Sequence, residues 1–331
     1  MDSRKYGVVY TPDRLADFAA ELLHLEMHDI KCGSVLDPAC GECALLKAAK
    51  RKLGEDFRYL GIDVDVDAYM VSKDEFSIVL NDSVLPKNVK HSTADYWKRK
   101  LGKVSVIIAN PPWSTEKIYD KDKLTNGGFS LISGQYDSFV LFVELAYKVL
   151  EDGGYFSFII PDSLFDSQNE KLRRFLATKT EIRVIARLGE KIFDEVNRAT
   201  TVIVCKKALP NTDSITHCFR LDTDSRKHFL SSEKPLIDFY NDAYHDVRQS
   251  RFLQNEACNF DIDIRSDEEK LISKIRSQTI DWDREFIFGR GVEISKSGEI
   301  VYCKKCGFAQ GYKKSQLIAK KKVCTHCGEV I

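Results

Sequence analysis

The sequence lacks a long uninterrupted hydrophobic run, and this absence argues against membrane-spanning and exported proteins. No apolar stretch approaches the roughly 20 residues that a membrane-spanning helix needs. The polar start, Met1–Lys5, is not followed by the apolar segment of a secretory signal. We therefore expect a soluble, cytoplasmic protein with no membrane partner.

The chain also lacks a net charge, because 50 basic side chains balance 50 acidic ones. The whole-chain value argues neither for nor against a nucleic-acid partner. The distribution is uneven, however, since eight lysines and only two glutamates lie between Lys296 and the C-terminus. At 331 residues and 43% hydrophobic content, the chain can form one sizeable domain and a smaller, basic module.

The ten cysteines do not occur in the short exported chain that would favour a disulfide framework. Four of them form two C-x2-C pairs with 17 residues between the pairs: Cys303, Cys306, Cys324 and Cys327. Gly307 and Gly328 follow the pairs, as expected for knuckles whose backbone N–H groups turn towards sulfur. This spacing predicts a structural zinc ribbon, with a redox dithiol pair as the alternative.

Short apolar runs alternate with helix-prone segments and predict an α/β fold with a mostly parallel sheet covered by helices on both faces. The expected strands are seven: 34–37, 58–63, 76–80, 104–109, 155–161, 181–188 and 200–207. Residues 1–208 are expected to form this domain, 209–285 a helical connecting region, and 286–331 the zinc-ribbon module. Phe193 lies between the last two expected strands, and its apolar side chain, considered alone, predicts a position in the hydrophobic core.

The fourth expected strand ends in Asn110-Pro111-Pro112-Trp113. Prolines have no N–H donor, so this turn leaves carbonyl groups available to accept hydrogen bonds. Asn110 adds a side-chain carbonyl, and Trp113 adds a flat apolar surface. The group suits a planar ring that bears an amino group, although a strand followed by a simple Pro-Pro turn remains an alternative.

Other strand ends carry acids. Asp37 opens the turn from Asp37 to Gly41, Asp63 ends the second strand, and Asp82 follows the third. At the carboxyl edge of a doubly wound sheet, such a turn brings backbone close to a nucleotide-like cofactor. Asp63 then suits the ribose hydroxyls and Asp82 an adenine amino group, whereas each acid alone could be a loop residue or a helix cap.

The segment after Tyr10 has the features of a helix start. Thr11 can cap the helix, Pro12 occupies the first turn, and Asp13 meets the positive end of the helix dipole. Apolar residues then recur on one face, so we expect this helix to pack against the sheet.

These motifs, in this order, resemble the gamma class of DNA adenine-N6 methyltransferases of restriction-modification systems, the N-6 DNA methylase family. The resemblance covers roughly Tyr10 to Lys207. Fewer than thirty residues separate Asp82 from Asn110, so no recognition domain fits between the cofactor and catalytic motifs. The resemblance implies a seven-stranded, Rossmann-like class I methyltransferase domain that uses S-adenosylmethionine.

The resemblance also implies roles for individual residues. The cofactor would be held by Thr11, Pro12, Asp37, Ala39, Gly41, Asp63, Asp82 and Asn110. The target amine would be oriented by the catalytic motif Asn110, Pro111, Pro112 and Trp113. Trp113 and Phe193 would stack on a flipped adenine, whose extrusion costs a few kcal/mol. No Pro-Cys nucleophile of the cytosine-C5 type lies beside the motif.

Glu42 and Cys43 stand where the family usually has a small residue and a glycine, so the shape of the cofactor loop is open. Alternative interpretations are methylation of RNA, protein glutamine or cytosine N4, and a non-catalytic zinc-ribbon subunit that binds DNA. The expected partner is double-stranded DNA. Residues 286–331 resemble the beginning of the recognition region that follows the catalytic domain in this family, and the chain ends four residues after Cys327. We therefore expect recognition to be completed by a further C-terminal region or by a specificity or restriction subunit.

Overall fold

The computed structural model describes residues 10–87, 89, 92–113, 119–132, 136–193, 198–278, 298–313 and 323–330. It contains two compact units, Met1–Glu269 and Lys270–Ile331. The segment 286–297, where we expected a target-recognition region to begin, lies outside the described residues. Within the described part, no helix combines the length and apolar character needed to cross a membrane.

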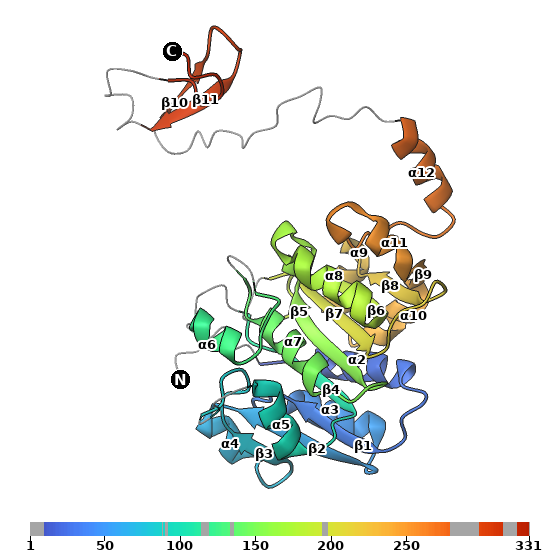
Figure 1. Ribbon diagram of the computed structural model, residues 1–331. Coiled ribbons are helices and arrows are strands. Elements are labelled where there is room, and N and C mark those ends of the chain that lie inside the picture. The colour runs from blue at the N-terminus through green and yellow to red at the C-terminus, as the bar shows by residue number, and fades with distance from the viewer. Residues whose placement is uncertain are drawn as a thin grey trace. The chain divides into compact units, whose positions relative to one another are not determined.

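A mixed sheet runs through the first unit in the strand order β3-β2-β1-β4-β5-β7-β6-β8-β9 (Figure 1). Neighbours from β3 to β5 are parallel, and β7 runs antiparallel between β5 and β6. The strands are β1 Gly33–Asp37, β2 Phe57–Asp63, β3 Ser77–Leu80, β4 Val106–Ala109, β5 Tyr155–Pro161, β6 Glu181–Gly189, β7 Thr200–Lys206, β8 Ile215–Arg220 and β9 His245–Arg248.

The sheet has nine strands, so the expected count of seven was wrong, although all seven expected strands are present. The two additional strands come from the region that we expected to be a connector. Strand β8 pairs in parallel with β6, and β9 pairs antiparallel with β8. Strand β8 thereby covers an edge of β6 that would otherwise expose unpaired backbone groups. The sheet therefore continues past residue 208.

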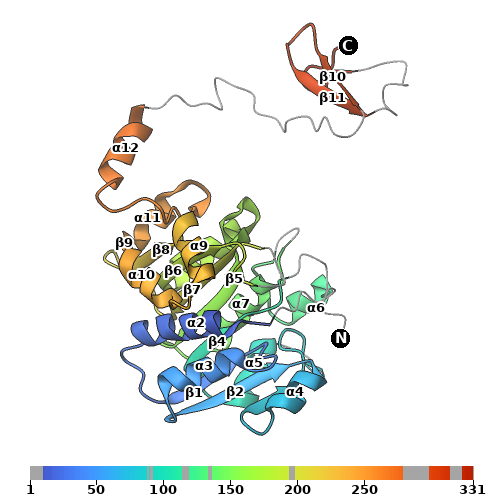
Figure 2. The ribbon, with the colours of Figure 1, turned by 180° about the vertical axis from the view of Figure 1, so that it is seen from behind.

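Helices cover both faces of the sheet. Helices α2 (Asp13–Glu26) and α3 (Ala44–Leu53) lie on the face seen in Figure 2, and α5 (Thr93–Leu101), α7 (Phe139–Val149) and α8 (Glu170–Lys179) lie on the face seen in Figure 1. The other helices described in this unit are α4 Val66–Ser72, α6 Lys121–Asn126, α9 Thr223–Ser231, α10 Leu236–Ala243, α11 Gln249–Gln254 and the 3-10 turns Asp162–Phe165, Ser167–Asn169 and Glu256–Cys258.

Each face of the sheet has its own hydrophobic core, as strand β4 illustrates. Successive side chains of a strand point to opposite faces. Ile107 and Ala109 accordingly belong to the core beneath α5 and α7, whereas Val106 and Ile108 belong to the core beneath α2 and α3. Because both faces are buried, the central strands are largely apolar, and the acids Asp37 and Asp63 lie at strand ends.

Residues 209–269, which follow the seven expected strands and which we call the C-terminal extension, are joined to the rest of the first unit by buried hydrogen bonds. The side-chain oxygen of Gln249 in α11 accepts from the Ile182 N–H at 2.8 Å. Its nitrogen donates to the carbonyls of Ala177 at 3.1 Å and Thr180 at 2.7 Å. These bonds join α11 to the end of α8 and the start of β6.

The second unit contains α12 (Glu269–Gln278, whose first residue closes the first unit) and an antiparallel pair, β10 (Gly298–Tyr302) and β11 (Ala309–Lys313). The first C-x2-C pair lies between these two strands, and the second follows an isolated bridge residue, Val323.

Candidate active site and metal centre

A cleft of about 390 Å³ opens where β1, β2, β3 and β4 end. Strands β1 and β4 are neighbours although two strands separate them in sequence, so the cleft lies at the topological switch point where open α/β sheets bind ligands. Its volume is within the range of small-molecule sites. Eight residues singled out from the sequence line it: Thr11, Asp37, Ala39, Gly41, Asp63, Asp82, Asn110 and Pro112.

Asp37, at the end of β1, is a buried acid that lines this cleft. Its Oδ1 accepts from the Ala39 N–H at 3.0 Å, and its side chain is 1% exposed. Burial raises the pKa of its carboxyl well above the usual range. None of the described ion pairs involves Asp37. A buried carboxylate without a cation is costly, so the site suits a ligand that brings positive charge.

Asp63 holds the loop between β1 and α3. Its Oδ2 accepts from the Gly41 N–H at 2.6 Å, and its Oδ1 accepts from the Asp65 N–H at 2.8 Å. Burial raises the pKa of this carboxyl as well. The side chain expected at a ribose thus also has a role within the protein, because it ties together the ends of two neighbouring strands.

Cys43, the departure from the family pattern, has a backbone suited to glycine. Its φ is 63°, in the left-handed region, and its buried side chain packs in the core beneath α2 and α3. Gly41 in the same loop has φ 46°. The loop therefore has glycine-like geometry at both positions, with the conformational cost at Cys43 opposed by burial of its thiol.

Asp82, past the end of β3, uses one carboxylate oxygen within the protein. Its Oδ1 accepts from the N–H groups of Val84 at 2.8 Å and Leu85 at 3.0 Å, and from the Tyr119 hydroxyl at 3.3 Å. Its Oδ2 receives no hydrogen bond from the described residues. Asp82 therefore retains an acceptor for a ligand.

Phe142 and Tyr119 line the cleft but were not identified from the sequence. Phe142 belongs to α7, a helix in which nine of eleven side chains are buried. Its 4% exposure shows that one face of this helix serves both the core and the cleft. No sequence pattern separates these two roles, because each requires an apolar side chain.

Thr11 does not cap the first helix, so that expectation was wrong. The N-cap of α2 is Pro12, and no side chain caps this end. The Thr11 hydroxyl instead accepts a hydrogen bond from Asn110 Nδ2 at 3.0 Å. Pro12 takes the cap position because its fixed φ of −59° leads the chain into the helix.

The carbonyl groups of the Asn-Pro-Pro-Trp turn have different partners. The Pro112 carbonyl accepts from the Ser138 hydroxyl, and the Trp113 carbonyl accepts from Arg198 at 2.9 Å. No described residue donates to the Pro111 carbonyl. The turn is thus fixed at its far end, while the Pro111 carbonyl next to Asn110 retains its capacity to accept.

Trp113 and Phe193 lie against each other and outside the cleft lining. Their ring centroids are 5.2 Å apart with an interplanar angle of 86°, and both side chains are buried. An edge-to-face pair leaves no slot between parallel rings for a base. The Arg198 guanidinium lies 5.9 Å from the centroid of the Trp113 ring, so Arg198 contacts both the ring and the carbonyl of Trp113.

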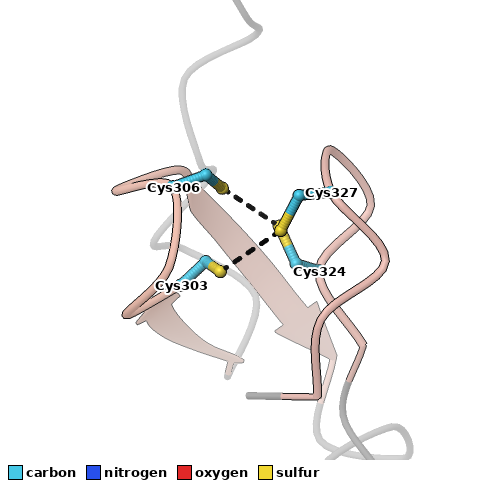
Figure 3. A group of neighbouring side chains, drawn as sticks. All are labelled: Cys303, Cys306, Cys324 and Cys327. Atoms are coloured by element: carbon cyan, nitrogen blue, oxygen red, sulfur yellow. Dashed lines mark hydrogen bonds between the residues drawn. The ribbon is translucent and has the colours of Figure 1, made fainter.

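The four cysteines of the second unit converge on one point (Figure 3). Their sulfurs all lie within 4.8 Å of one another, with Cys303–Cys327 and Cys306–Cys324 separations of 3.6 Å. Backbone N–H groups of residues 305 and 306 point at the Cys303 sulfur and lower the pKa of this thiol to about 7.

The two C-x2-C pairs share one local conformation. In each pair the first cysteine donates its N–H to the residue five positions later, Phe308 or Glu329. The glycine after the second cysteine returns an N–H to the first cysteine, and both glycines have φ near 73°. The two knuckles expected from Gly307 and Gly328 are therefore present.

Comparison with known proteins gives consistent matches. A family model described as N-6 DNA Methylase matches residues 1–251. The type II methyltransferase M.VspI of Vibrio sp. (strain 343) is 24% identical over 241 residues, which cover 71% of this chain and 57% of that protein. The type II methyltransferase M.TthHB8I of Thermus thermophilus is 26% identical over 243 residues, with coverages of 70% and 52%.

Among solved structures, a type I restriction-modification methyltransferase subunit from Streptococcus thermophilus superposes with a TM-score of 0.59 at 16% identity. The match covers 78% of this chain and 59% of that subunit, and it concerns the fold alone. The chain spans about half the length of the curated relatives that it matches.

Proposed function

The chain belongs to the N-6 DNA methylase family, and we propose that it transfers the methyl group of S-adenosylmethionine to the N6 amine of an adenine in double-stranded DNA. We place this activity in restriction-modification or host DNA protection. The observation that carries the proposal is the pair of neighbouring acceptors, Asn110 and the Pro111 carbonyl, next to a cleft whose buried acid takes part in none of the ion pairs of the described residues.

The residues of the cleft fit the methyl donor, which supplies a methyl group on a positively charged sulfonium. Asp37 offers the buried negative charge that a cationic ligand would neutralise. Asp82 offers Oδ2 to an adenine amino group, in a cleft that the Phe142 side chain also lines. Asp63 keeps the Gly41 loop against the cleft and has further lone pairs for the ribose hydroxyls.

The target amine has two hydrogens, and two acceptors are needed to orient it. The side-chain carbonyl of Asn110 and the main-chain carbonyl of Pro111 are the proposed acceptors. Hydrogen bonds to both would hold the nitrogen lone pair in line with the methyl group. Positioning and electrostatics then account for catalysis, and no covalent intermediate with the protein is needed.

The target adenine leaves the duplex to reach this cleft, at a cost of a few kcal/mol that stacking on an aromatic ring offsets. Trp113 and Phe193 are the proposed stacking residues. Because the two rings contact each other in this structure, they would move apart when a base binds between them. Arg198 donates to the carbonyl of Trp113, the last residue of the motif that begins at Asn110, and so keeps the backbone of Trp113 in place.

The four cysteines are the proposed ligands of a structural zinc ion. A Zn–S bond of about 2.3 Å in a tetrahedron places sulfurs about 3.8 Å apart, close to the observed 3.6 Å. For sequence recognition we propose a specificity or restriction subunit, or a further C-terminal region, as the partner of this chain on DNA.

The test is methyl transfer from labelled S-adenosylmethionine to unmethylated genomic DNA, with product nucleosides identified by mass spectrometry. We expect N6-methyladenine from the wild type. With saturating S-adenosylmethionine, Asn110→Ala should reduce its formation by at least about 100-fold. Because Asn110 also lines the donor cleft, the affinity for S-adenosylmethionine is measured in parallel by calorimetry, so that a loss of donor binding is told apart from a loss of methyl transfer.

The proposal fails if Asn110→Ala methylates adenine as fast as the wild type. It also fails if the product is N4-methylcytosine, or if only RNA or protein is labelled. A partner subunit supplied in the same assay separates an inactive enzyme from one that lacks DNA recognition.

A further inference from the structure

Helix α2 is a rigid support for the residue that precedes it. Its inner face is buried along its whole length, from Leu15 to Leu23. Near its N-terminal end, the Arg14 guanidinium lies 3.9 Å from the centroid of the Phe229 ring and donates to the Lys234 carbonyl at 2.7 Å. The C-terminal extension thus holds the end of α2 three residues from Thr11.

The Thr11 hydroxyl is available for a role outside this helix, because the helix does not use it as a cap. It lines the cleft and accepts from Asn110 Nδ2 at 3.0 Å, across 99 positions of sequence. When the NH2 group of a side-chain amide donates a hydrogen bond in one direction, the carbonyl oxygen of the amide faces away from that partner. The Thr11 contact is therefore in a position to decide which end of the Asn110 amide meets the target amine.

A hydroxyl by itself does not fix this choice, since it can donate to the amide oxygen or accept from the amide nitrogen. The choice becomes fixed when the hydroxyl proton is given to another acceptor. The remaining lone pairs of Oγ1 can then only accept, and the Asn110 nitrogen must face Thr11. A methyl donor bound in the same cleft can supply such an acceptor.

We propose that Thr11 is a positioning residue that orients the Asn110 amide, and that occupancy of the cleft by the methyl donor fixes this orientation. This inference rests on the proposed function and adds a link between donor binding and target orientation. Thr11 acts through Asn110 and, in this role, does not itself touch the target amine.

The test compares Thr11→Val, which keeps the shape but removes the hydroxyl, with Thr11→Ser, which keeps the hydroxyl. With saturating S-adenosylmethionine, we expect the single-turnover rate of Thr11→Val to fall by about 10- to 100-fold, as for a misplaced reacting group. Thr11→Ser should stay within about threefold of the wild type. The affinity for S-adenosylmethionine is measured in parallel by calorimetry.

A second readout needs no turnover. In protein labelled with 15N-asparagine, the side-chain NH2 signal of Asn110 is assigned by its loss in Asn110→Asp. We expect Thr11→Val to shift this signal and Thr11→Ser to leave it near its wild-type position. Adding S-adenosylmethionine should shift it in the wild type and in Thr11→Ser more than in Thr11→Val.

A double-mutant comparison separates positioning from donor binding. An aspartate has no NH2 group to orient, so Thr11→Val should slow Asn110→Asp by less than about threefold. Equal slowing of the wild type and Asn110→Asp, or an unchanged NH2 signal in Thr11→Val, overturns the inference. If the wild type methylates no adenine while the NH2 shifts occur as expected, the proposed function fails and the orientation of Asn110 by Thr11 stands.

Discussion

At the scale of single residues, the main feature of the cleft is a set of polar groups that the protein satisfies only in part. Among the described residues, Asp37 is buried with one backbone donor, and Asp82 receives hydrogen bonds at one of its two carboxylate oxygens. The Pro111 carbonyl, between the cleft-lining residues Asn110 and Pro112, likewise has no donor among the described residues. Buried polar groups are usually paired, so incomplete pairing concentrated in one cleft indicates a ligand site.

Replacing Asp37 by asparagine tests the role of its charge. The native carboxyl has a raised pKa, so the unliganded protein loses stability as pH rises from the unfolded pKa of about 3.9 towards the native value. An asparagine side chain cannot ionise, so Asp37→Asn should melt at a higher temperature than the unliganded wild type at pH 8. Its affinity for S-adenosylmethionine should fall by at least about 30-fold.

Calorimetry and thermal melts at pH 4 and pH 8 measure both effects. Because protonation neutralises the wild-type carboxyl, the melting temperatures of the two proteins should be closer at pH 4 than at pH 8. Equal donor affinity in the two proteins would show that Asp37 does not face the donor's positive charge.

At the scale of elements, one buried arginine joins helix α8 to the extension behind it. Arg173 is 1% exposed and donates to the Cys258 carbonyl at 3.1 Å and the Ala257 carbonyl at 3.1 Å. It also donates to the carbonyls of Leu164 at 2.7 Å and Asp166 at 2.6 Å. The charge is compensated by carbonyl dipoles that converge from two segments, which fixes the extension against α8.

Arg173→Met should lower the free energy of unfolding by about 3–5 kcal/mol, because it leaves these carbonyls without a donor in a buried site. Its neighbour Arg174 is a matched control, since its side chain is 53% exposed and pairs with Glu170 on the surface. Arg174→Met should change stability by less than about 1 kcal/mol. Urea unfolding followed by circular dichroism compares the two, and equal losses would contradict the assigned role of Arg173.

At the scale of the whole molecule, the cleft and the cysteine cluster belong to different compact units. Every described residue that lines the cleft lies in Met1–Glu269, and all four cysteines of the cluster lie in Lys270–Ile331. Binding of the methyl donor is therefore expected to be independent of the metal.

Metal analysis should find about one zinc per chain, and Cys303→Ser should reduce this content. Cys32→Ser, at an exposed cysteine outside the cluster, should retain it. Zinc removal by a chelator should leave the affinity of the first unit for S-adenosylmethionine within about twofold, because no cluster residue lines the cleft. A larger loss of affinity on chelation would contradict the independence of the two sites.

Local periodicity and short spacings were enough to predict the seven expected strands, the acids and the amide at their ends, and the two cysteine knuckles. The three-dimensional fold was needed to show that β8 and β9 extend the sheet, that Phe142 and Tyr119 line the cleft, and that Trp113 packs on Phe193. The same holds for the contact of Thr11 with Asn110, which replaces the expected helix cap. Edge pairing and side-chain partners depend on residues far apart in the chain, and a hydroxyl or an apolar ring carries no local mark of its partner.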